Sequence, residues 1–295
     1  MRTSLYLCGA LLYHCASTAS AALSLTGPST GWIAVQYANP NLADPSNDQQ
    51  TGGIEGDIVG NASLPSFYTA FDNAGTPSLT DGSIGFRVRL AGDASPAGLK
   101  TVIWIGIDAN ADGKIDLFAG AIEDSKIGLY RAGTGQNISP STTSISTTNP
   151  YYEQTTNVSA SLSFTPVSTI DSSASNFNID GGSGGGANNA DHFVTFVIPF
   201  SSLVSAINSI GLAGVTNFNE NSGLRYVVAT SNQANSLNMD LNGISGGVNS
   251  SSTWTSLGGL TTSYSSSGLP DSIPEPSGLA LSAAALSLTF FRRKR

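Results

Sequence analysis

The sequence has almost no cysteine. Its 295 residues include two cysteines, Cys8 and Cys15, and both lie close to the N-terminus. This region has Arg2, an apolar stretch and the small-residue run STASAA, which is the layout of a secretory signal peptide cleaved near Ala21. The alternative is a buried first helix. If the leader is removed, the mature chain has no cysteine, which excludes disulfides and thiolate ligands or nucleophiles.

Basic residues are also scarce. The chain has 12 Lys and Arg residues against 20 Asp and Glu residues, and five of the 12 are Arg2 and residues 292–295 at the two ends. Such an acidic body lacks the positive surface that attracts nucleic acid or an anionic membrane, so we expect no nucleic-acid partner. An acidic surface suits cations and neutral polymers such as polysaccharide, although solubility alone also accounts for it.

Apolar residues of the body occur in short stretches rich in β-branched and aromatic residues, separated by Gly, Asn, Asp, Ser and Pro. One helix is predicted in residues 201–214, capped by Ser201 or Ser202 and ended by Gly211 or Gly214. The pattern predicts an all-β fold, namely an antiparallel, jelly-roll-like β-sandwich with one short helix. The strand-like stretches are residues 31–37, 83–90, 101–108, 115–122, 192–200 and 224–231.

Charged and apolar residues alternate in SIGFRVRL, residues 83–90. Phe86, Val88 and Leu90 alternate with Arg87 and Arg89. A period of two residues is typical of a half-buried strand, so we expect the arginines on the face turned away from the core.

We divide the chain into four segments. The signal peptide, residues 1–21, is followed by the β-sandwich body, residues 22–244. A flexible Ser/Gly-rich spacer, residues 245–272, then leads to a C-terminal apolar segment, residues 273–295, with a short helix. Residues 132–190 are rich in Ser, Thr, Gly and Asn but retain apolar alternation, and we interpret them as strands joined by long loops.

The loop DANADGKID, residues 108–116, has oxygen-bearing side chains at alternate positions. This spacing resembles the calcium loops of EF-hands and dockerins, although Ala119 stands where those loops carry a bidentate acid. We predict a weak calcium site with a further ligand such as Glu123 or Asp124. The alternative is a turn that satisfies its own backbone. The candidate ligands are Asp108, Asn110, Asp112, Asp116 and, through its backbone carbonyl, Lys114.

Other residues are weaker candidates. NMDLNG, residues 238–243, has Asp240 and Asn242 in a poorer arrangement of the same kind, and we interpret it as a turn. Trp254 lies in a polar Ser/Thr stretch and is the candidate for an exposed ring that contacts a sugar. We predict no catalytic residue. The chain has no G-x-S-x-G motif, which argues against a serine hydrolase. Sequence spacing cannot place a glycosidase pair among Glu55, Asp57, Glu123, Asp124, Glu153 and Glu220.

The last 22 residues combine three features in a fixed order: a proline-rich break, an apolar run over residues 278–291 and a basic cluster. Residues 276–291 would span about 24 Å as a helix, which is short for a membrane span of about 20 residues. A basic cluster stays on the cytoplasmic side of a membrane. The break is Pro274-Glu275-Pro276 and the cluster is Arg292, Arg293, Lys294 and Arg295.

This tail resembles the PEP-CTERM sorting signal of Gram-negative bacteria. The resemblance implies export by Sec-type machinery, transient anchoring in the inner membrane and recognition by an exosortase, which is a membrane-embedded cysteine-type processing enzyme. It also implies removal of the tail near the PEP motif, with a permanent anchor as the alternative. Proteins with this signal are often associated with exopolysaccharide and biofilm, and their bodies vary widely.

We therefore expect an exported cell-surface or extracellular-matrix protein. Its body would be a non-catalytic, calcium-stabilised β-sandwich that associates with exopolysaccharide in a biofilm. The body also loosely resembles carbohydrate-binding-like β-sandwiches of secreted bacterial proteins, which is an analogy of fold alone. The alternatives are an extracellular carbohydrate-active hydrolase or lyase with paired carboxylates, and a structural coat protein without a small ligand.

Overall fold

The computed structural model describes residues 23–29, 31–35, 44–94, 97–171, 178–179, 190–246 and 248–266. The predicted signal peptide and the C-terminal sorting segment lie outside these residues. Within these ranges, no helix combines the length and the apolar character that a bilayer span requires.

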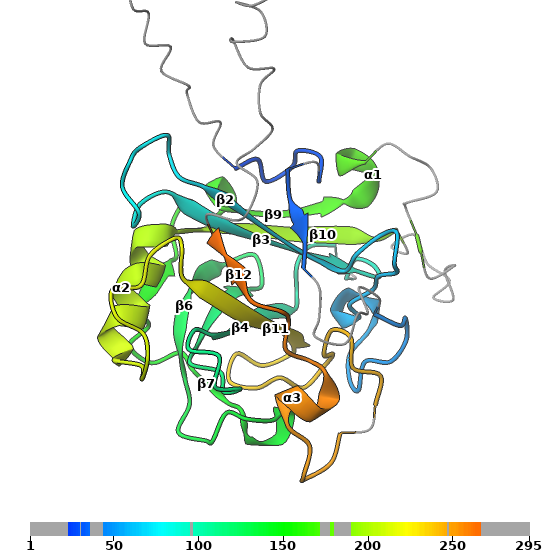
Figure 1. The fold of residues 1–295 in the computed structure, drawn as a ribbon. Helices are drawn as coiled ribbons and strands as arrows, with labels where there is room; N and C mark the ends of the chain where they lie inside the picture. The colour runs from blue at the N-terminus through cyan, green and yellow to red at the C-terminus, as the bar shows by residue number, and fades with distance from the viewer. Residues whose placement is uncertain are drawn as a thin grey trace, which may run out of the picture.

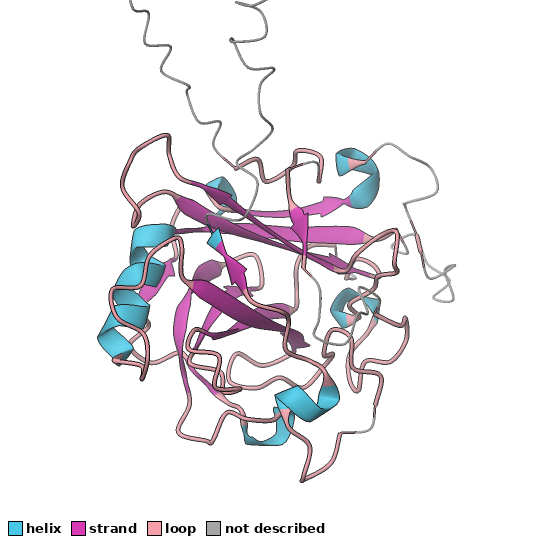
Figure 2. Ribbon diagram, in the orientation of Figure 1, coloured by secondary structure: helices cyan, strands magenta, loops and turns pink. Residues whose placement is uncertain are grey.

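The described residues form two antiparallel sheets packed face to face, which are the upper and lower layers in Figures 1 and 2. The predicted all-β, antiparallel fold is therefore confirmed. The first sheet has the order β1-β2-β3-β10-β9, and the second has the order β12-β11-β4-β5-β6-β7, with β8 also paired to β6. The first sheet contains β1 (Ile33–Ala34), β2 (Phe67–Asp72), β3 (Ser83–Leu90), β9 (Leu162–Pro166) and β10 (His192–Pro199). The second contains β4 (Val102–Asp108), β5 (Leu117–Ile122), β6 (Lys126–Ala132), β7 (Ile145–Ser146), β8 (Tyr152–Gln154), β11 (Gly223–Ser231) and β12 (Tyr264–Ser265).

Each of the six predicted strand-like stretches contains a strand, and β3 matches its prediction residue for residue. The stretch 132–190, interpreted as strands and loops, contributes β7, β8 and β9 from its described part. Apart from the 11-residue α2, the helical elements are only three or four residues long. They are η1 (Ile54–Gly56), η2 (Pro140–Thr142), η3 (Val158–Ala160), α1 (Val167–Ile170), α2 (Phe200–Ile210) and α3 (Trp254–Leu257).

Aromatic side chains from both sheets meet in the core. The Tyr226 ring, from β11, lies edge-on to Phe67 and Phe86 of the first sheet, with ring centroids 5.9 and 5.8 Å apart. Edge-to-face pairs add about 0.5–1.5 kcal/mol to the free energy gained from burial alone. These contacts fix the two sheets against each other.

Strand β4 is buried at all seven positions. Ile103, Ile105 and Ile107 face the core between the sheets. Trp104 points to the opposite face, where it packs in a second apolar cluster with Trp254. Burial on both faces explains why this strand is an almost continuous apolar run instead of an alternating one.

Helix α2 begins without a side-chain cap. Phe200 is its first residue, and the predicted cap by Ser201 or Ser202 is wrong because neither residue precedes the helix. The backbone N–H of Phe200 instead donates to the carbonyl of Gly82, at 2.9 Å, so a neighbouring segment supplies the acceptor that a cap would provide. Gly211 ends the helix with φ of 72°, as predicted.

The folded body continues beyond the predicted boundary at residue 244. Within residues 248–266, Thr253 caps α3 through a reciprocal pair of hydrogen bonds with Ser256. Strand β12 pairs with β11, and Leu260, in the segment between α3 and β12, is 1% exposed. The serines and threonines of this stretch cap α3 and contribute to strand β12. Residues 248–266 therefore form part of the fold and not a flexible spacer.

The arginines of β3 are buried, which differs from the expected half-exposed strand. Arg87 is 0% exposed. Its Nε donates to Thr195 Oγ1 at 3.0 Å and its Nη1 to Ser29 Oγ at 2.9 Å. The guanidinium lies 4.3 Å from the centroid of the Trp32 ring, and burial lowers its pKa to about 10. Residues 23–29 and 31–34 thus cover part of the outer face of the first sheet.

The second arginine makes an ion pair inside the protein. Arg89 Nη1 lies 2.8 Å from Asp191 Oδ2, and the two side chains are 2% and 0% exposed. The Phe193 ring packs against the same guanidinium, with its centroid 4.9 Å away. This pair brings opposite charges together inside the protein, where an uncompensated charge is costly.

We expect Asp191→Asn to lower the free energy of unfolding by about 3–5 kcal/mol, because it removes the carboxylate that pairs with the buried Arg89 guanidinium at 2.8 Å. Urea denaturation followed by circular dichroism measures the change. Lys126→Met is the matched control, since it removes an exposed ion pair with Glu153 and is expected to cost less than about 1 kcal/mol. Equal losses in the two variants would contradict this assignment.

Candidate functional site

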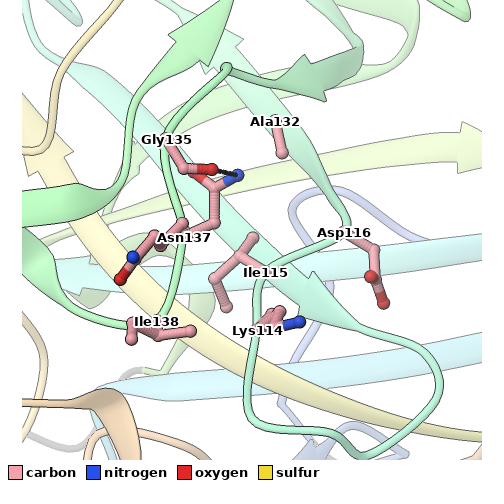
Figure 3. Close-up of a pocket in the computed structure, with 8 residues that line it drawn as sticks. Lys114, Ile115, Asp116, Ala132, Gly135, Asn137 and Ile138 are labelled. Carbon is pink, nitrogen blue, oxygen red and sulfur yellow. Dashed lines mark hydrogen bonds between the residues drawn. The ribbon is translucent and has the colours of Figure 1, made fainter.

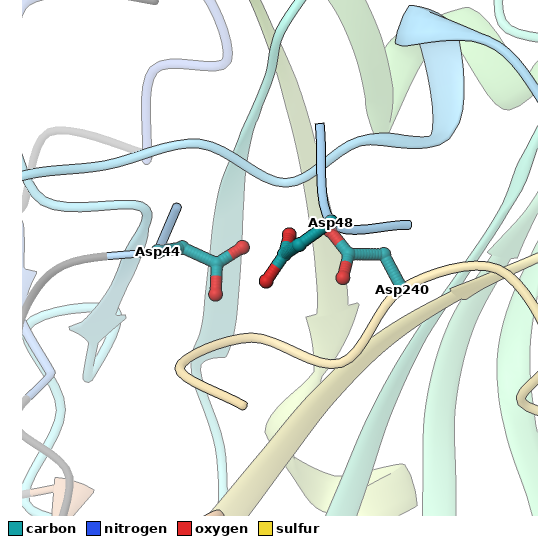
Figure 4. A group of neighbouring side chains, drawn as sticks. All are labelled: Asp44, Asp48 and Asp240. Carbon is teal, nitrogen blue, oxygen red and sulfur yellow. The ribbon is translucent and has the colours of Figure 1, made fainter. Parts of the chain in front are cut away.

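Three aspartates converge in the described part of the chain. One carboxylate oxygen from each of Asp44, Asp48 and Asp240 lies within 4.8 Å of the other two, and no other trio of His, Cys, Asp or Glu in that part meets this distance (Figure 4). Calcium binds oxygen at 2.3–2.6 Å, so two ligands on opposite sides of one ion are about 4.8 Å apart. The spacing of this acid cluster therefore fits a metal ion.

Two distant segments bring the acid cluster together. Asp44 forms a β-bridge with Gly60, in which each backbone N–H donates to the other's carbonyl at 3.3 and 3.1 Å. Asp240 lies beside β11, where its backbone N–H donates to Thr230 Oγ1 at 3.1 Å. Asp48 belongs to the turn that follows Asp44. Backbone contacts thus fix the position of each segment independently of the carboxylates.

The carboxylates of the cluster are only partly satisfied by hydrogen bonds. Asp240 Oδ2 accepts from the Ile58 N–H at 2.7 Å, and Asp44 Oδ1 accepts from the Gly243 N–H. Asp44 Oδ2 is buried and has no hydrogen-bond partner. Both oxygens of Asp48 are also withdrawn from the surface, although its side chain as a whole is half-buried.

Burial and mutual repulsion raise the pKa of these carboxyl groups. The pKa of Asp44 lies well above its usual range because of burial first and then the charges of Asp240, Asp48 and Asp57. Burial, Asp48 and Asp57 raise the pKa of Asp240 to about 7. Burial also raises the pKa of Asp48, while its own N–H and the Ser245 hydroxyl oppose the shift. Negative charge is therefore concentrated here.

A hollow of about 220 Å³ opens beside the cluster, and Asp48 and Asp240 form part of its wall. Most of the remaining lining is apolar, including Leu237, Met239 and Ile244. The hollow thus reaches two of the three residues of the cluster.

The predicted calcium loop connects β4 to β5. Asp108 Oδ2 accepts from the Gly113 N–H at 3.0 Å and lies 3.6 Å from Arg225 Nη1. Asp116 Oδ2 accepts from the Ala109 N–H at 2.8 Å. Gly113 has φ of 86°, which suits the sharp turn expected at that position. Burial raises the pKa of Asp108 and raises that of Asp116 to about 6.

The other side chains of this loop also bond to its own backbone. Asn110 Oδ1 accepts from the Asp112 N–H at 3.3 Å, and Asp112 Oδ1 accepts from the Lys114 N–H at 2.9 Å. This is the pattern of a self-satisfied turn. Its acids do not converge as those of the acid cluster do within the described residues. Calcium binding by this loop stays a prediction.

The suggested additional ligands of the loop lie far from it. Glu123 and Asp124 follow the last residue of β5, whereas the loop precedes its first residue. A strand advances about 3.3 Å per residue, so about 20 Å separate the two ends. Neither acid can complete a calcium site at the loop.

A larger open hollow of about 540 Å³ lies next to this loop (Figure 3). Lys114 and Asp116 approach it from the loop, and Asn137 approaches it from the segment after β6. Asn137 Nδ2 is held by the carbonyls of Gly133 and Gly135, at 3.0 and 3.1 Å. No aromatic residue lines this hollow, so it offers no ring on which a sugar could stack.

Trp254 does not present an exposed ring, and that prediction is wrong. The residue is 0% exposed, and its Nε1 donates to Thr143 Oγ1 at 3.2 Å. Its ring packs in the cluster that covers the outer face of β4. The capping box of Thr253 and Ser256 turns the polar stretch into a short helix, which directs the tryptophan inward.

The sequence pattern did not indicate Asp44 or Asp48 as site residues, and it placed Asp240 in a turn. The first two acids occur four positions apart in DPSND, residues 44–48, a stretch that also reads as an ordinary turn. Only the fold brings this stretch to residues 238–243.

Comparison with protein-family models, with curated proteins and with solved structures found no match. Proposals for function therefore rest on the residues of this chain.

The acid cluster predicts an unusual dependence of stability on pH in metal-free buffer. Between its unfolded pKa of 3.8 and its folded pKa of about 7, Asp240 binds more protons in the folded state, so stability from this group falls as pH rises. Asp44, Asp48 and Asp57 are the charges that repel it.

The expected result is that Asp240→Asn unfolds at a progressively higher temperature than the wild type as the pH is raised from 4 to 7. Differential scanning calorimetry measures both proteins in the presence of a chelator. Asp124→Asn, which changes an exposed acid, serves as the control. A difference between wild type and Asp240→Asn that does not change with pH would contradict the raised pKa.

Proposed function

We propose that this chain is an exported cell-surface or extracellular-matrix protein that an exosortase sorts through its C-terminal PEP motif. The observation that carries the proposal is the order of three features at the end of the sequence: the Pro274-Glu275-Pro276 break, the apolar run and the basic cluster. The N-terminal leader supports it, because a sorting signal of this kind acts on exported chains.

Each part of the tail has a physical role in this proposal. The prolines interrupt helical structure and leave an extended stretch that a processing enzyme can bind. The apolar run holds the chain in the inner membrane while the arginines and lysine stay on the cytoplasmic side. Cleavage near the PEP motif then releases the body. Without cysteine, the body has no disulfide to stabilise it, so its stability comes from the hydrophobic core shared by the two sheets.

The body is proposed to be a non-catalytic β-sandwich with jelly-roll-like connectivity that associates with exopolysaccharide. The connectivity is supported by β3 and β10 pairing in one sheet while β4 and β11 pair in the other, so the chain crosses repeatedly between layers. Acidic residues outnumber basic ones, which favours a neutral or cation-bridged polymer over a polyanion. Calcium at residues 108–116 is part of the same proposal.

One observation favours a carbohydrate-active hydrolase or lyase as a second candidate. Retaining glycosidases use two carboxyl groups about 5 Å apart, and the acid cluster brings carboxylates of raised pKa to the wall of a hollow. The hollow of about 220 Å³ is smaller than the 300–1,000 Å³ usual for ligand pockets. We therefore place this candidate second.

Mass spectrometry of the protein isolated from its native cells tests sorting. The expected mature chain begins after Ala21 and ends near Pro276. Glu275→Ala is the matched variant, and it is expected to retain the tail because the motif is changed while the apolar run and the basic cluster are kept. A wild-type C-terminal peptide that still ends in Arg295 would contradict processing by an exosortase.

Association with polysaccharide is tested on a glycan array, together with an assay for reducing sugar. The proposal expects binding to at least one polysaccharide without release of sugar. Saccharide release by the wild type that Asp240→Asn abolishes and Asp124→Asn preserves would instead identify the enzyme. Absence of both binding and release would leave a structural coat protein and overturn the association with polysaccharide.

A further inference from the structure

We infer that Asp44, Asp48 and Asp240 bind a hard divalent cation of the calcium and magnesium class. This site differs from the predicted loop at residues 108–116, and it goes beyond the proposed function because it depends on neither export nor sorting.

The first observation is the convergence of negative charge. Oxygens of the three carboxylates lie within 4.8 Å of one another, although Asp44 and the Gly243 N–H that binds it are 199 positions apart in the chain. Repulsion between carboxylates at this distance is strong where water is excluded. The ion pairs among the described residues involve other acids, so none of them offsets this charge.

The second observation is an unsatisfied oxygen. Asp44 is 2% exposed, and its Oδ2 has no hydrogen-bond partner. Its carboxylate points toward that of Asp48, with Asp240 on the far side of Asp48 (Figure 4). Buried polar atoms are almost always paired, so an unpaired carboxylate oxygen directed at two other carboxylates indicates a missing positive partner.

The donor chemistry selects the class of cation. All three ligands are carboxylate oxygens, and no cysteine or histidine belongs to the group. Oxygen ligands suit calcium, magnesium and manganese, whereas zinc sites use mainly nitrogen and sulfur. Calcium takes six to eight oxygens. Water in the adjoining hollow can supply those that the protein does not.

The cation would close a seam between two parts of the chain, residues 44–60 and residues 238–243. Direct hydrogen bonds already join them: the Gln50 N–H donates to the Met239 carbonyl at 2.7 Å, and Thr51 Oγ1 donates to the Asn238 carbonyl at 2.8 Å. An ion held by both sides binds the folded state and not the separated segments, so it raises stability by mass action.

Protons are the competing explanation. Carboxyl groups that share protons would also relieve the repulsion, and the raised pKa values fit that state. The two explanations differ in their response to calcium and to amidation. An asparagine mimics a protonated aspartate, so it is tolerated in both cases, but it removes a charged ligand only if a cation binds.

Thermal unfolding of the full-length chain, stripped with chelator and then supplied with calcium chloride or magnesium chloride, tests the site. Calcium at about 100 times its dissociation constant is expected to raise the wild-type Tm by about 5–10 °C. Asp44→Asn and Asp240→Asn are expected to show a smaller rise than the wild type while unfolding in chelator at or above the wild-type temperature. Asp124→Asn is expected to retain the full rise. In Asp112→Ala, which removes the contribution of the predicted loop, adding Asp44→Asn is expected to abolish the rise that remains.

Each possible result of this experiment points to a different conclusion about where the cation binds. No rise with either metal in the wild type, or a rise of full wild-type size in both Asp44→Asn and Asp240→Asn, overturns the site. A rise lost only in Asp112→Ala assigns the ion to the predicted loop instead and also overturns it. If Asp240→Asn fails to fold, Asp48→Asn gives the same test at a half-buried position. None of these results depends on whether the tail is cleaved.

Discussion

Burial of the second sheet on both faces is the constraint on which the rest of the structure depends. One face of β4 packs against the first sheet, and the other presents Trp104, which must be covered. The chain after β11 provides that cover, with Ile244, Trp254 and Leu260. The same covering segment carries Asp240 over the end of β11 and against residues 44–60. The acid cluster is thus a consequence of how the sheet is covered.

Buried charge is handled differently at two places in the fold. On the outer face of the first sheet, Arg89 is neutralised by Asp191 at 2.8 Å, and Arg87 is surrounded by hydroxyls, carbonyls and the Trp32 ring. At the seam, the carboxylates have backbone N–H donors but no comparable positive side chain among the described ion pairs. In our account, a cation from solution supplies the charge that the chain does not.

The strands were predictable because β-branched and aromatic residues occur in short runs between turn formers, as in β3 and β4. Alternation in β3 did not reveal that Arg87 is covered, since a segment more than 50 residues earlier does so. Trp254 was misplaced because a polar neighbourhood says little about a ring that a capped helix turns inward. DANADGKID was recognisable as a pattern because its oxygen-bearing side chains lie close together in sequence. Asp44 and Asp240 were not, because only tertiary structure joins them.

The central structural claim is that a divalent cation occupies the seam. A crystal structure grown with manganese chloride, recorded near the manganese absorption edge, tests it most directly, because manganese shares the oxygen ligands of calcium and scatters anomalously. The account expects an anomalous peak between the carboxylates of Asp44, Asp48 and Asp240. An ordered structure without a peak there, or with carboxyl groups hydrogen-bonded directly to one another, would contradict it.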